Sequence, residues 1–549
     1  MTIDKSVLQQ VYNSTCTTRD YKYTYGTAGF RDKASKLDTV MFATGIIACW
    51  RSMVLCGTPV GVMVTASHNP PLDNGVKVVE PTGAMLIQEW EPLTTKLANI
   101  AANESFEKVY DFILEVSKDP KFPFQENKPS LIIGHDSRES SPRLTKLLVN
   151  TAVEIYNADI HNYGLVTTPQ LHFITSLWNA KYNKNTNDVI SVDNYYNYFN
   201  ASWSKFQELY DFNSFKSFEN LIIDSANGIG GPKVTDLIST WPSTLRGNVS
   251  IINNSWENPN LLNNDCGADY VKTNQKLPKG IQNPSNLNLH CSFDGDADRI
   301  VFYYISEVDQ KFHLLDGDKI ATLFAKFLSN LLKETNLTDK LKLGVVQTAY
   351  ANGSSTNYLT NVLKVPVSCT KTGVKHLHHE ASTKYDIGIY FEANGHGTVL
   401  FSERFQQVLQ NEPKTTATQT LLLFQKIINQ TVGDAMADML GVITVLSVSK
   451  ITPSQWDQGY KDLPNKLAKV IVPDRSVFIT TNQERQLTSP VGLQEKIDVA
   501  VSKVTNGRSF VRASGTEDAV RVYAEAATQE ETEKLSQEVC KFVLSSVSN

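Results

Sequence analysis

The chain contains 549 residues, of which 41% are hydrophobic and 20% are charged, and its 52 basic against 57 acidic residues give a net charge of −5. This length is too great for a single core and predicts several domains of roughly 150 residues each. The slight acidic excess gives no support for nucleic acid or an anionic membrane as the main partner, so we expect neither. Any site for an anionic substrate must be built from locally placed basic groups.

Seven cysteines are scattered singly along the chain, and no two of them form a Cys-x-x-Cys pair. This spacing disfavours a zinc site or a disulfide framework and favours a reducing compartment. The first residues lack the apolar core of a signal peptide, and the apolar run at 40–50 is too short to span a bilayer. We therefore predict a cytoplasmic protein, and we expect a monomer.

Short apolar runs recur through residue 391, and each leads into a polar or glycine-containing loop followed by a helix-like stretch. The runs are 61–64, 131–133, 221–223, 343–346 and 386–391. Continuous apolar runs separated by helices are typical of α/β domains whose sheets are covered on both faces. Because such sheets bind ligands beyond the carboxyl ends of their strands, the loops after these runs are the candidate sites.

The C-terminal part has a different pattern. The runs 442–448, 475–480, 497–502, 508–511 and 520–525 are typical of strands, and the apolar residues within 530–547 fall at helical spacing. Strands followed by a terminal helix predict a separate α+β domain.

The first of these loops places a serine on a tight turn. Residues 65–70 read Thr-Ala-Ser-His-Asn-Pro, and the Asn-Pro pair disfavours a helix and helps to form a turn that displays the hydroxyl of Ser67 beside His68. An ordinary Ser-Asn-Pro turn has the same appearance. A second loop at 294–299 favours phosphoryl transfer through a phosphoserine instead.

In that second loop three aspartates alternate along the chain. Asp294, Asp296 and Asp298 share one side of an extended segment, where bare carboxylates repel one another and a hard cation is the natural occupant. Oxygen ligands suit magnesium, manganese or calcium better than zinc. An EF-hand loop is excluded because Arg299 stands where glycine is needed and Ile305 where glutamate is needed. A solvated acidic turn is the alternative, but strand-like runs flank the loop, and we predict Mg²⁺ here.

Two basic residues near the serine are candidates for balancing charge. Arg31 ends the glycine-containing segment 25–31 and could clamp a phosphate, and Lys77 lies ten residues after Ser67 across an Asn-Gly turn that could return its amine to the serine. Each residue taken alone is typical of a solvated surface side chain.

Further loops offer groups for a sugar phosphate. Residues 512–517, Arg-Ala-Ser-Gly-Thr-Glu, combine a guanidinium, hydroxyls and backbone N–H groups into a cradle for a phosphate dianion, with Arg521 close in sequence. A polar hairpin is the alternative there. Residues 392–397 offer donors and acceptors for sugar hydroxyls, and 372–376 form another polar loop after a strand-like run.

Together these loops resemble the α-D-phosphohexomutase superfamily, and the resemblance runs from Tyr25 to Arg521. It implies three similar mixed-sheet α/β domains and a smaller C-terminal α+β domain around a central cleft. On this basis we predict a phosphoserine-loop domain, a metal-binding domain, a sugar-binding domain and a phosphate-binding domain, with the respective bounds 1–185, 186–308, 309–448 and 449–549.

The resemblance also implies roles for individual residues. The catalytic set is Ser67, which is phosphorylated in the active enzyme, with Lys77, Arg31 and His68. The metal site is Ser67, Asp294, Asp296 and Asp298 with Mg²⁺ bound. The substrate-binding set is Arg299, Thr372, Gly373, Glu392, Asn394, Arg512, Ser514, Gly515, Thr516 and Arg521. Lys77 is the first candidate for the general acid/base.

Two departures from the common sequence pattern of the superfamily indicate which class of sugar phosphate is the substrate. The Gly-x-Asp-x-Arg loop at 134–138 follows the serine loop, whereas it precedes that loop in most of the superfamily, and Asn394 replaces a serine of the sugar loop. Both features resemble the branch that acts on N-acetylglucosamine phosphates, most closely its fungal members. The implied activity is interconversion of the 6- and 1-phosphates through a bisphosphate, feeding UDP-N-acetylglucosamine synthesis. A glucose- or mannose-phosphate mutase, a phosphatase and a non-catalytic sugar-phosphate-binding protein are the alternatives.

Overall fold

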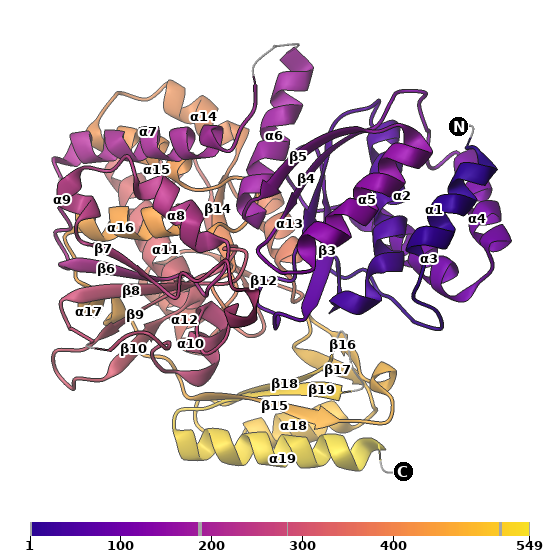
Figure 1. Ribbon diagram of the computed structural model, residues 1–549. Helices are drawn as coiled ribbons and strands as arrows, with labels where there is room; N and C mark the ends of the chain where they lie inside the picture. The colour runs from indigo at the N-terminus through magenta and orange to yellow at the C-terminus, as the bar shows by residue number, and fades with distance from the viewer. Residues whose placement is uncertain (1–2, 185–188, 213, 283, 515–518, 548–549) are drawn as a thin grey trace. The chain divides into compact units, whose positions relative to one another are not determined.

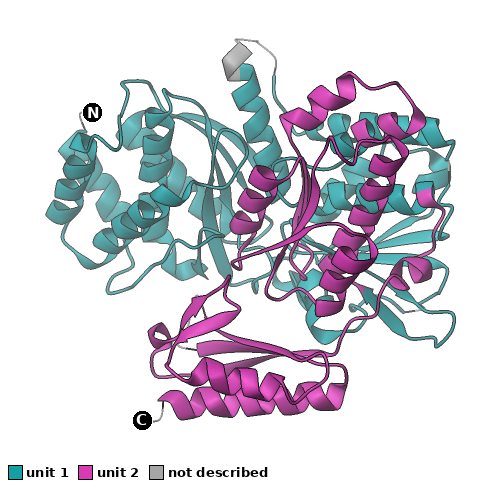
Figure 2. Ribbon diagram, turned by 180° about the vertical axis from the view of Figure 1, so that it is seen from behind, with its two compact units in different colours: residues 1–314, 423–448 teal, residues 315–422, 449–549 magenta. Residues whose placement is uncertain are grey.

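Figure 1 shows the computed structural model of the protein, which describes residues 3–184, 189–212, 214–282, 284–514 and 519–547. The chain forms two compact units (Figure 2), one made of Met1–Leu314 with Leu423–Val448 and the other of Leu315–Leu422 with Ser449–Asn549. Among the described residues, no helix has the length and apolar character needed to cross a membrane.

The first unit begins with a five-stranded sheet. Its strand order is β1-β3-β2-β4-β5, with the respective bounds Phe30–Lys33, Asp73–Val79, Val60–Val64, Ser130–His135 and Asp159–Leu165. Strands β2, β4 and β5 run parallel, whereas β3 is antiparallel to both of its neighbours. The helices of this region are α1 (Lys5–Thr15), α2 (Asp38–Val54), α3 (Glu91–Asn103), α4 (Phe106–Lys118), α5 (Ser141–Tyr156) and α6 (Thr168–Lys184).

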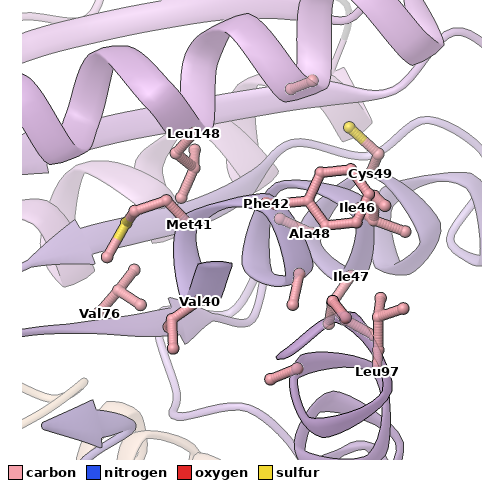
Figure 3. Close-up of a cluster of buried hydrophobic side chains, with 14 of the residues drawn as sticks. Val40, Met41, Phe42, Ile46, Ile47, Ala48, Cys49, Val76, Leu97 and Leu148 are labelled. Carbon is pink, nitrogen blue, oxygen red and sulfur yellow. The ribbon is translucent and has the colours of Figure 1, made fainter. Parts of the chain in front are cut away.

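Side chains of this sheet alternate between two buried faces. Val62 of β2 belongs to the large core under α2, and its neighbour Met63 belongs to a smaller cluster formed with α6. Figure 3 shows part of the large core, where side chains of α2 pack with Val76 of β3, Leu97 of α3 and Leu148 of α5. Burial on both faces explains why the strands read as continuous apolar runs.

A second five-stranded sheet completes the first unit. Its order is β10-β9-β8-β6-β7, with the respective bounds Phe312–Leu315, Ile300–Ile305, Asn288–Phe293, Asn220–Asp224 and Val249–Ile252. Strands β8, β6 and β7 are parallel, and β9 is antiparallel to β8. Its helices are α7 (Asp193–Tyr210), α8 (Gly230–Ile238), α9 (Ser243–Arg246), α10 (Ala268–Asn274) and the buried α16 (Ala435–Ser449).

The second unit contains a four-stranded sheet and a C-terminal α+β part. The sheet has the order β12-β11-β13-β14, with the respective bounds Val367–Thr370, Leu343–Thr348, Ile387–Phe391 and Gly397–Phe401. Its helices are α11 (Gly317–Glu334), α12 (Gly353–Asn357), α13 (Val374–Lys384), α14 (Glu403–Gln410) and α15 (Thr416–Ile427).

The C-terminal part begins with α17 (Pro453–Asp457) and is built on the sheet β15-β19-β18, with the respective bounds Asn465–Ile471, Ala519–Glu525 and Arg508–Ala513. Helices α18 (Leu493–Val501) and α19 (Gln529–Val547) cover one face of this sheet (Figure 1). A separate hairpin, β16 (Ile479–Thr481) with β17 (Gln486–Ser489), precedes α18. The predicted α+β character is confirmed.

Three of the sheets share one arrangement, namely three parallel strands with an antiparallel hairpin strand at one side. The matching orders are β3-β2-β4-β5, β9-β8-β6-β7 and β14-β13-β11-β12. The hairpin comes first along the chain in the first sheet and last in the other two. This permutation is why the 134–138 loop follows the serine loop, and the repeated arrangement confirms three similar mixed-sheet α/β domains.

Two of the predicted C-terminal strands are wrong. Residues 442–448 lie in α16, and residues 497–502 fall at the end of α18 and its C-cap. Helix α16 is buried on all sides, so its branched apolar residues lack the period that marks a helix. In the run 475–480 the strand begins only at Ile479, after a 3₁₀ turn at Arg475–Val477. The strands at 508–511 and 520–525 and the terminal helix are confirmed.

Candidate active site

The three functional loops of the α/β sheets occupy the same topological position. Each connects a central strand to its antiparallel hairpin partner. The serine loop (65–70) lies between β2 and β3, the metal loop (294–299) between β8 and β9, and the sugar loop (392–397) between β13 and β14. Each loop therefore begins at the carboxyl end of a parallel strand, where ligands of α/β sheets bind.

The serine loop in the first unit is held by a buried arginine. Ser67 has a φ of 51°, a left-handed conformation that is unfavourable for a residue with a side chain. The buried guanidinium of Arg138 donates hydrogen bonds of 2.6–2.9 Å to four backbone carbonyl oxygens of this loop, those of Ser67, Asn69, Pro70 and Asp73. Asp136 in turn accepts a bond of 3.0 Å from Arg138 Nε. This pair holds the serine in its strained turn.

Ser67 and the three aspartates lie together. Ser67 Oγ donates a hydrogen bond of 2.5 Å to Asp294 Oδ2. Asp294, Asp296 and Asp298 are buried, and each offers a carboxylate oxygen within 4.8 Å of those of the other two. The structure therefore brings together all four residues of the predicted metal site.

Backbone N–H groups at the starts of three helices donate hydrogen bonds to the metal loop. The carbonyl oxygens of its three central residues, Gly295, Asp296 and Ala297, accept bonds from the N–H groups of Ile229, Thr168 and Ala435, respectively, at 3.2, 3.2 and 3.0 Å. These donors cap or open α8, α6 and α16. Ala297, between Asp296 and Asp298, has a left-handed φ of 58°, and these bonds help to hold it in that unfavourable conformation.

The chemistry of the three carboxylates fits a hard divalent cation. Asp296 Oδ2 accepts a bond of 2.6 Å from the Thr168 hydroxyl and lies 3.2 Å from the Thr65 hydroxyl. The buried Asp296 Oδ1 has no hydrogen-bond partner among the described residues. Burial and then the neighbouring carboxylates of Asp298 and Asp296 raise the pKa of Asp294 well above its ordinary value. A cation bound by these oxygens would give Asp296 Oδ1 a partner and would offset the repulsion among the three carboxylates.

Cationic side chains surround the carboxylates. Lys77, opposite Met63 in the β2–β3 pairing, places its Nζ 3.9 Å from Asp296 Oδ2 and 3.7 Å from Asp298 Oδ2. Arg299 Nε lies 3.8 Å from Asp298 Oδ1, and its Nη1 bonds Asp269 at 2.9 Å. The Lys77 amine therefore lies beside two carboxylates of the metal loop.

Arg31 and His68 complete this group. Arg31 lies on β1 opposite Gly75 of β3, and burial followed by repulsion from Arg299 lowers the pKa of its guanidinium. His68 Nδ1 lies 3.5 Å from Ser67 Oγ. Burial and then Arg299 lower the pKa of His68 to about 3, which favours a neutral imidazole at neutral pH.

The sugar loop lies in the second unit. Asn394 Oδ1 accepts a bond of 3.0 Å from His396 N, and its Nδ2 donates one of 3.4 Å to Glu392 Oε2. The start of α11 packs directly on this loop, because a Cβ on Gly317 would stand 1.9 Å from the carbonyl oxygen of Glu392. Glu392 and Asn394 thus present their polar groups from one tight turn.

The phosphate loop lies on the C-terminal sheet of the same unit. Arg512 of β18 pairs with Arg521 of β19, which pairs with Lys469 of β15, so these cations stand on one face of the sheet. The N–H of Ser514 bonds the carbonyl oxygen of Ala519 at 2.8 Å. Gly515 and Thr516, also predicted to bind substrate, lie outside the described residues.

Two predicted substrate residues meet through a third. Thr372 and Gly373 form the turn before α13, and Gly373, at a φ of 121°, is the N-cap of that helix. Glu484 accepts bonds from Thr372 N and Thr372 Oγ1 at 2.9 and 2.5 Å, and from Arg512 Nε at 3.1 Å.

Several residues that support the site were not predicted from the sequence, namely Thr65, Arg138, Thr168, Asp269 and Glu484. Thr65 and Arg138 had a signal, since they belong to the 65–70 and 134–138 motifs.

Comparison with family models covers most of the chain. Models described as phosphoacetylglucosamine mutase AMG1, domains II and III, match residues 185–301 and 316–451. Models described as phosphoglucomutase/phosphomannomutase domain I and C-terminal domain match residues 26–108 with 114–183, and 467–542.

Individual relatives match from end to end. The phosphoacetylglucosamine mutase of Saccharomyces cerevisiae is 52% identical over 100% of both chains. The Aspergillus fumigatus N-acetylphosphoglucosamine mutase solved in complex with GlcNAc-6P and magnesium is 43% identical, covers 99% of both chains and has a TM-score of 0.90. A serine-to-alanine variant of that enzyme solved with glucose 1,6-bisphosphate is 42% identical, also covers 99% of both chains and has a TM-score of 0.91.

Full-length identity to the Saccharomyces protein agrees with the branch that the position of the 134–138 loop and Asn394 resemble. The chain belongs to the phosphoacetylglucosamine mutase family of the α-D-phosphohexomutases.

Proposed function

We propose that the protein interconverts N-acetylglucosamine 6-phosphate and N-acetylglucosamine 1-phosphate, using a phosphoryl group carried on Ser67 and a bisphosphate intermediate. The observation that carries this proposal is the 2.5 Å contact between Ser67 Oγ and one of three convergent buried carboxylates. The Aspergillus fumigatus complexes with GlcNAc-6P and magnesium and with glucose 1,6-bisphosphate support the substrate, the metal and the intermediate.

The first transfer moves the phosphoryl group from Ser67 to the sugar. The oxygen of the sugar 1-hydroxyl attacks phosphorus, the bond from phosphorus to Ser67 Oγ breaks, and Ser67 Oγ gains the proton that the 1-hydroxyl loses. Lys77 is the proposed proton carrier, because its Nζ lies within 4 Å of two metal-site carboxylates that hold it in the loop cluster. The product of this step is a 1,6-bisphosphate.

The second transfer runs the same chemistry at the other end of the sugar. After the bisphosphate has reoriented, Ser67 Oγ attacks the 6-phosphorus, the bond to the sugar 6-oxygen breaks, and that oxygen takes the serine proton. N-acetylglucosamine 1-phosphate leaves and Ser67 is phosphorylated again. Catalysis of both transfers is mainly positioning and neutralisation of charge, which suits a serine held by Arg138 among fixed cations.

Asp294, Asp296 and Asp298 would hold Mg²⁺, with an oxygen from the group on Ser67 as a further ligand. When bound, the ion supplies positive charge against the phosphoryl oxygens. Arg31 and Arg299 add positive charge from the protein, and the neutral His68 can orient the seryl group by hydrogen bonding.

The second unit supplies the proposed contacts to the sugar phosphate. Arg512, Ser514 and Arg521 would bind the phosphate that is not reacting, together with Gly515 and Thr516 of the same loop.

The sugar itself would be recognised by the sugar loop. Glu392 would accept bonds from sugar hydroxyls, and the amide of Asn394 can both donate to and accept from an N-acetyl group. A bound acetamido sugar is therefore favoured over glucose.

Ser67→Ala tests the proposal. Mutase turnover should fall by at least about a thousandfold because the phosphoryl carrier is gone, and the thermal unfolding transition should stay in place. Ser176→Ala, on α6, is the matched control and should keep full activity. Intact-mass analysis with peptide mapping should find about 80 Da on Ser67 of the active enzyme.

The alternatives give different outcomes in the same assay. Release of inorganic phosphate without isomerisation would identify a phosphatase, and faster turnover of glucose or mannose phosphates than of the acetylated sugar would identify a different mutase. Substantial mutase activity in Ser67→Ala would overturn the role of the serine.

We also propose that the enzyme works in the cytoplasm as a monomer and supplies a sugar 1-phosphate to UDP-N-acetylglucosamine synthesis. Its seven cysteines are free thiols, as expected in a reducing compartment. Light scattering after size-exclusion chromatography would test the monomer, and fractionation of cells would test the location.

A further inference from the structure

Glu484 lies in an unusual backbone segment of the C-terminal part of the second unit. It lies in the connection between β16 and β17, where Asn482, Gln483 and Glu484 have φ values of 50°, 53° and 67°. Three consecutive residues with side chains in the left-handed region are costly, since this conformation is routine only for glycine. The surrounding contacts must therefore hold this hairpin tip in place.

The Glu484 carboxylate makes several of those contacts, beside the bonds of 2.7–3.2 Å that Arg485 donates to Asn482 and Gln483. Oε2 accepts from both Thr372 N and Thr372 Oγ1, at 2.9 and 2.5 Å, and Oε1 accepts from Arg512 Nε at 3.1 Å. The Glu484 and Arg512 side chains are 15% and 23% exposed, so this ion pair is largely shielded from water. Charge-assisted bonds in such a setting are stronger than those of exposed surface pairs.

The three residues come from different parts of the unit. Thr372 belongs to the turn that precedes α13 in the four-stranded-sheet part, whereas Glu484 and Arg512 belong to the C-terminal part. One carboxylate therefore joins the turn predicted to bind the sugar to the arginine predicted to bind the phosphate.

The geometry of the ion pair also orients the arginine. A guanidinium is planar, so a bond to Nε restricts the plane of the group and the direction in which its two Nη nitrogens point. Those nitrogens form the fork that binds a phosphate in a bidentate manner. Glu484 thus acts on the phosphate-binding edge of Arg512 from the opposite side of the group.

We propose that Glu484 is a positioning residue for substrate binding: it aims Arg512 at the phosphate and ties the C-terminal part to the Thr372 turn. This inference rests on the proposed function, because it assigns Arg512 to the sugar phosphate. The rival role is an internal anion that competes with the phosphate for the same donors. That role predicts the opposite sign, since removing the carboxylate would then strengthen binding.

Glu484→Gln keeps the size of the side chain and removes its charge. We expect KM for N-acetylglucosamine 6-phosphate to rise about tenfold with kcat changed less than about twofold, because the lost charged bonds serve binding. Glu484→Asp keeps the charge and should recover part of the loss. Glu495→Gln, in the first turn of α18, makes the same charge change in the same part of the chain and should leave KM unchanged.

A double-mutant cycle with Thr372→Val tests the link itself. Thr372→Val removes the hydroxyl donor while keeping the size of the side chain, so its effect on KM should be much smaller in Glu484→Gln than in the unaltered protein. Additive effects would overturn the proposed link.

Binding without turnover separates this inference from the proposed function. Calorimetry with N-acetylglucosamine 6-phosphate on Ser67→Ala, with and without Glu484→Gln, needs no mutase activity. Weaker binding in the double variant supports the inference even if the protein proves not to be a mutase. Equal or tighter binding would overturn it even if the mutase activity is confirmed.

Discussion

At the scale of the residue, the active serine depends on one buried side chain. A left-handed residue other than glycine costs about 1–2 kcal/mol, and Ser67 is held in that state by Arg138, whose two Nη nitrogens reach four carbonyl oxygens. A lysine keeps the charge of arginine but cannot make this fork. The loop that places the buried hydroxyl against Asp294 is therefore a consequence of guanidinium geometry as well as of the Asn-Pro turn.

Arg138→Lys should for this reason damage catalysis more than the loss of one contact suggests. We expect kcat to fall about a hundredfold through misplacement of Ser67, and the free energy of unfolding to fall by about 2–3 kcal/mol because buried carbonyl oxygens lose their donors. Steady-state kinetics and urea unfolding measure the two effects. Arg143→Lys, five residues along on α5 and half exposed, is the matched control. A kcat within twofold of the unaltered enzyme would contradict this account.

At the scale of the element, helix α16 anchors the metal loop from a distant part of the chain. Its first residue donates to Ala297, and the preceding Asp434 accepts from Tyr195, Asn429 and the N–H groups of Met436 and Ala437. Asp434 is fully buried, and burial raises its pKa to about 6 in spite of these donors. The helix start that supports the metal loop thus contains a titrating group.

The raised pKa of Asp434 predicts a pH dependence of stability. The folded state holds this proton more tightly than the unfolded chain, so the group stabilises the fold below its ordinary pKa of 3.8 and loses that contribution as pH rises through about 6. The stability of the unaltered protein relative to Asp434→Asn should therefore fall by about 3 kcal/mol over this interval. Denaturant unfolding of both proteins between pH 4 and 7 measures the difference, and a difference independent of pH would refute it.

The same elements show what the sequence can and cannot predict. The serine and sugar loops were identifiable because each follows a strand whose burial on both faces leaves a continuous apolar run. The strand before the metal loop contains His290 and Ser292, and that loop was identifiable from its three alternating aspartates instead. Helix α16 was mistaken for a strand over 442–448 because a helix buried on every side has no polar face. Glu484 was missed because its partners, Thr372 and Arg512, are brought to it only by tertiary structure.

At the scale of the whole molecule, the first unit holds several buried carboxylates close together. Three buried aspartates meet there, and helices from three separate parts of the chain hold their loop. The permuted order of strands in the first sheet leaves the serine loop at the same topological position as the metal and sugar loops. The fold thus keeps the loop geometry while the chain order changes, and the repulsion among the carboxylates is a cost that the folded unit carries unless a cation is bound.

We expect one substitution to have opposite effects on the stability of the protein with and without metal. In EDTA, Asp296→Asn should be at least as stable as the unaltered protein, because the amide can still accept from the Thr168 hydroxyl while one negative charge is removed. In Mg²⁺ the unaltered protein should gain about 2.7 kcal/mol at a concentration one hundred times the dissociation constant, and Asp296→Asn should gain little. Calorimetric unfolding of both proteins in the two buffers measures this, with Asp111→Asn on the exposed side of α4 as the control. If Mg²⁺ stabilised Asp296→Asn as much as the unaltered protein, the three carboxylates would not be the metal site.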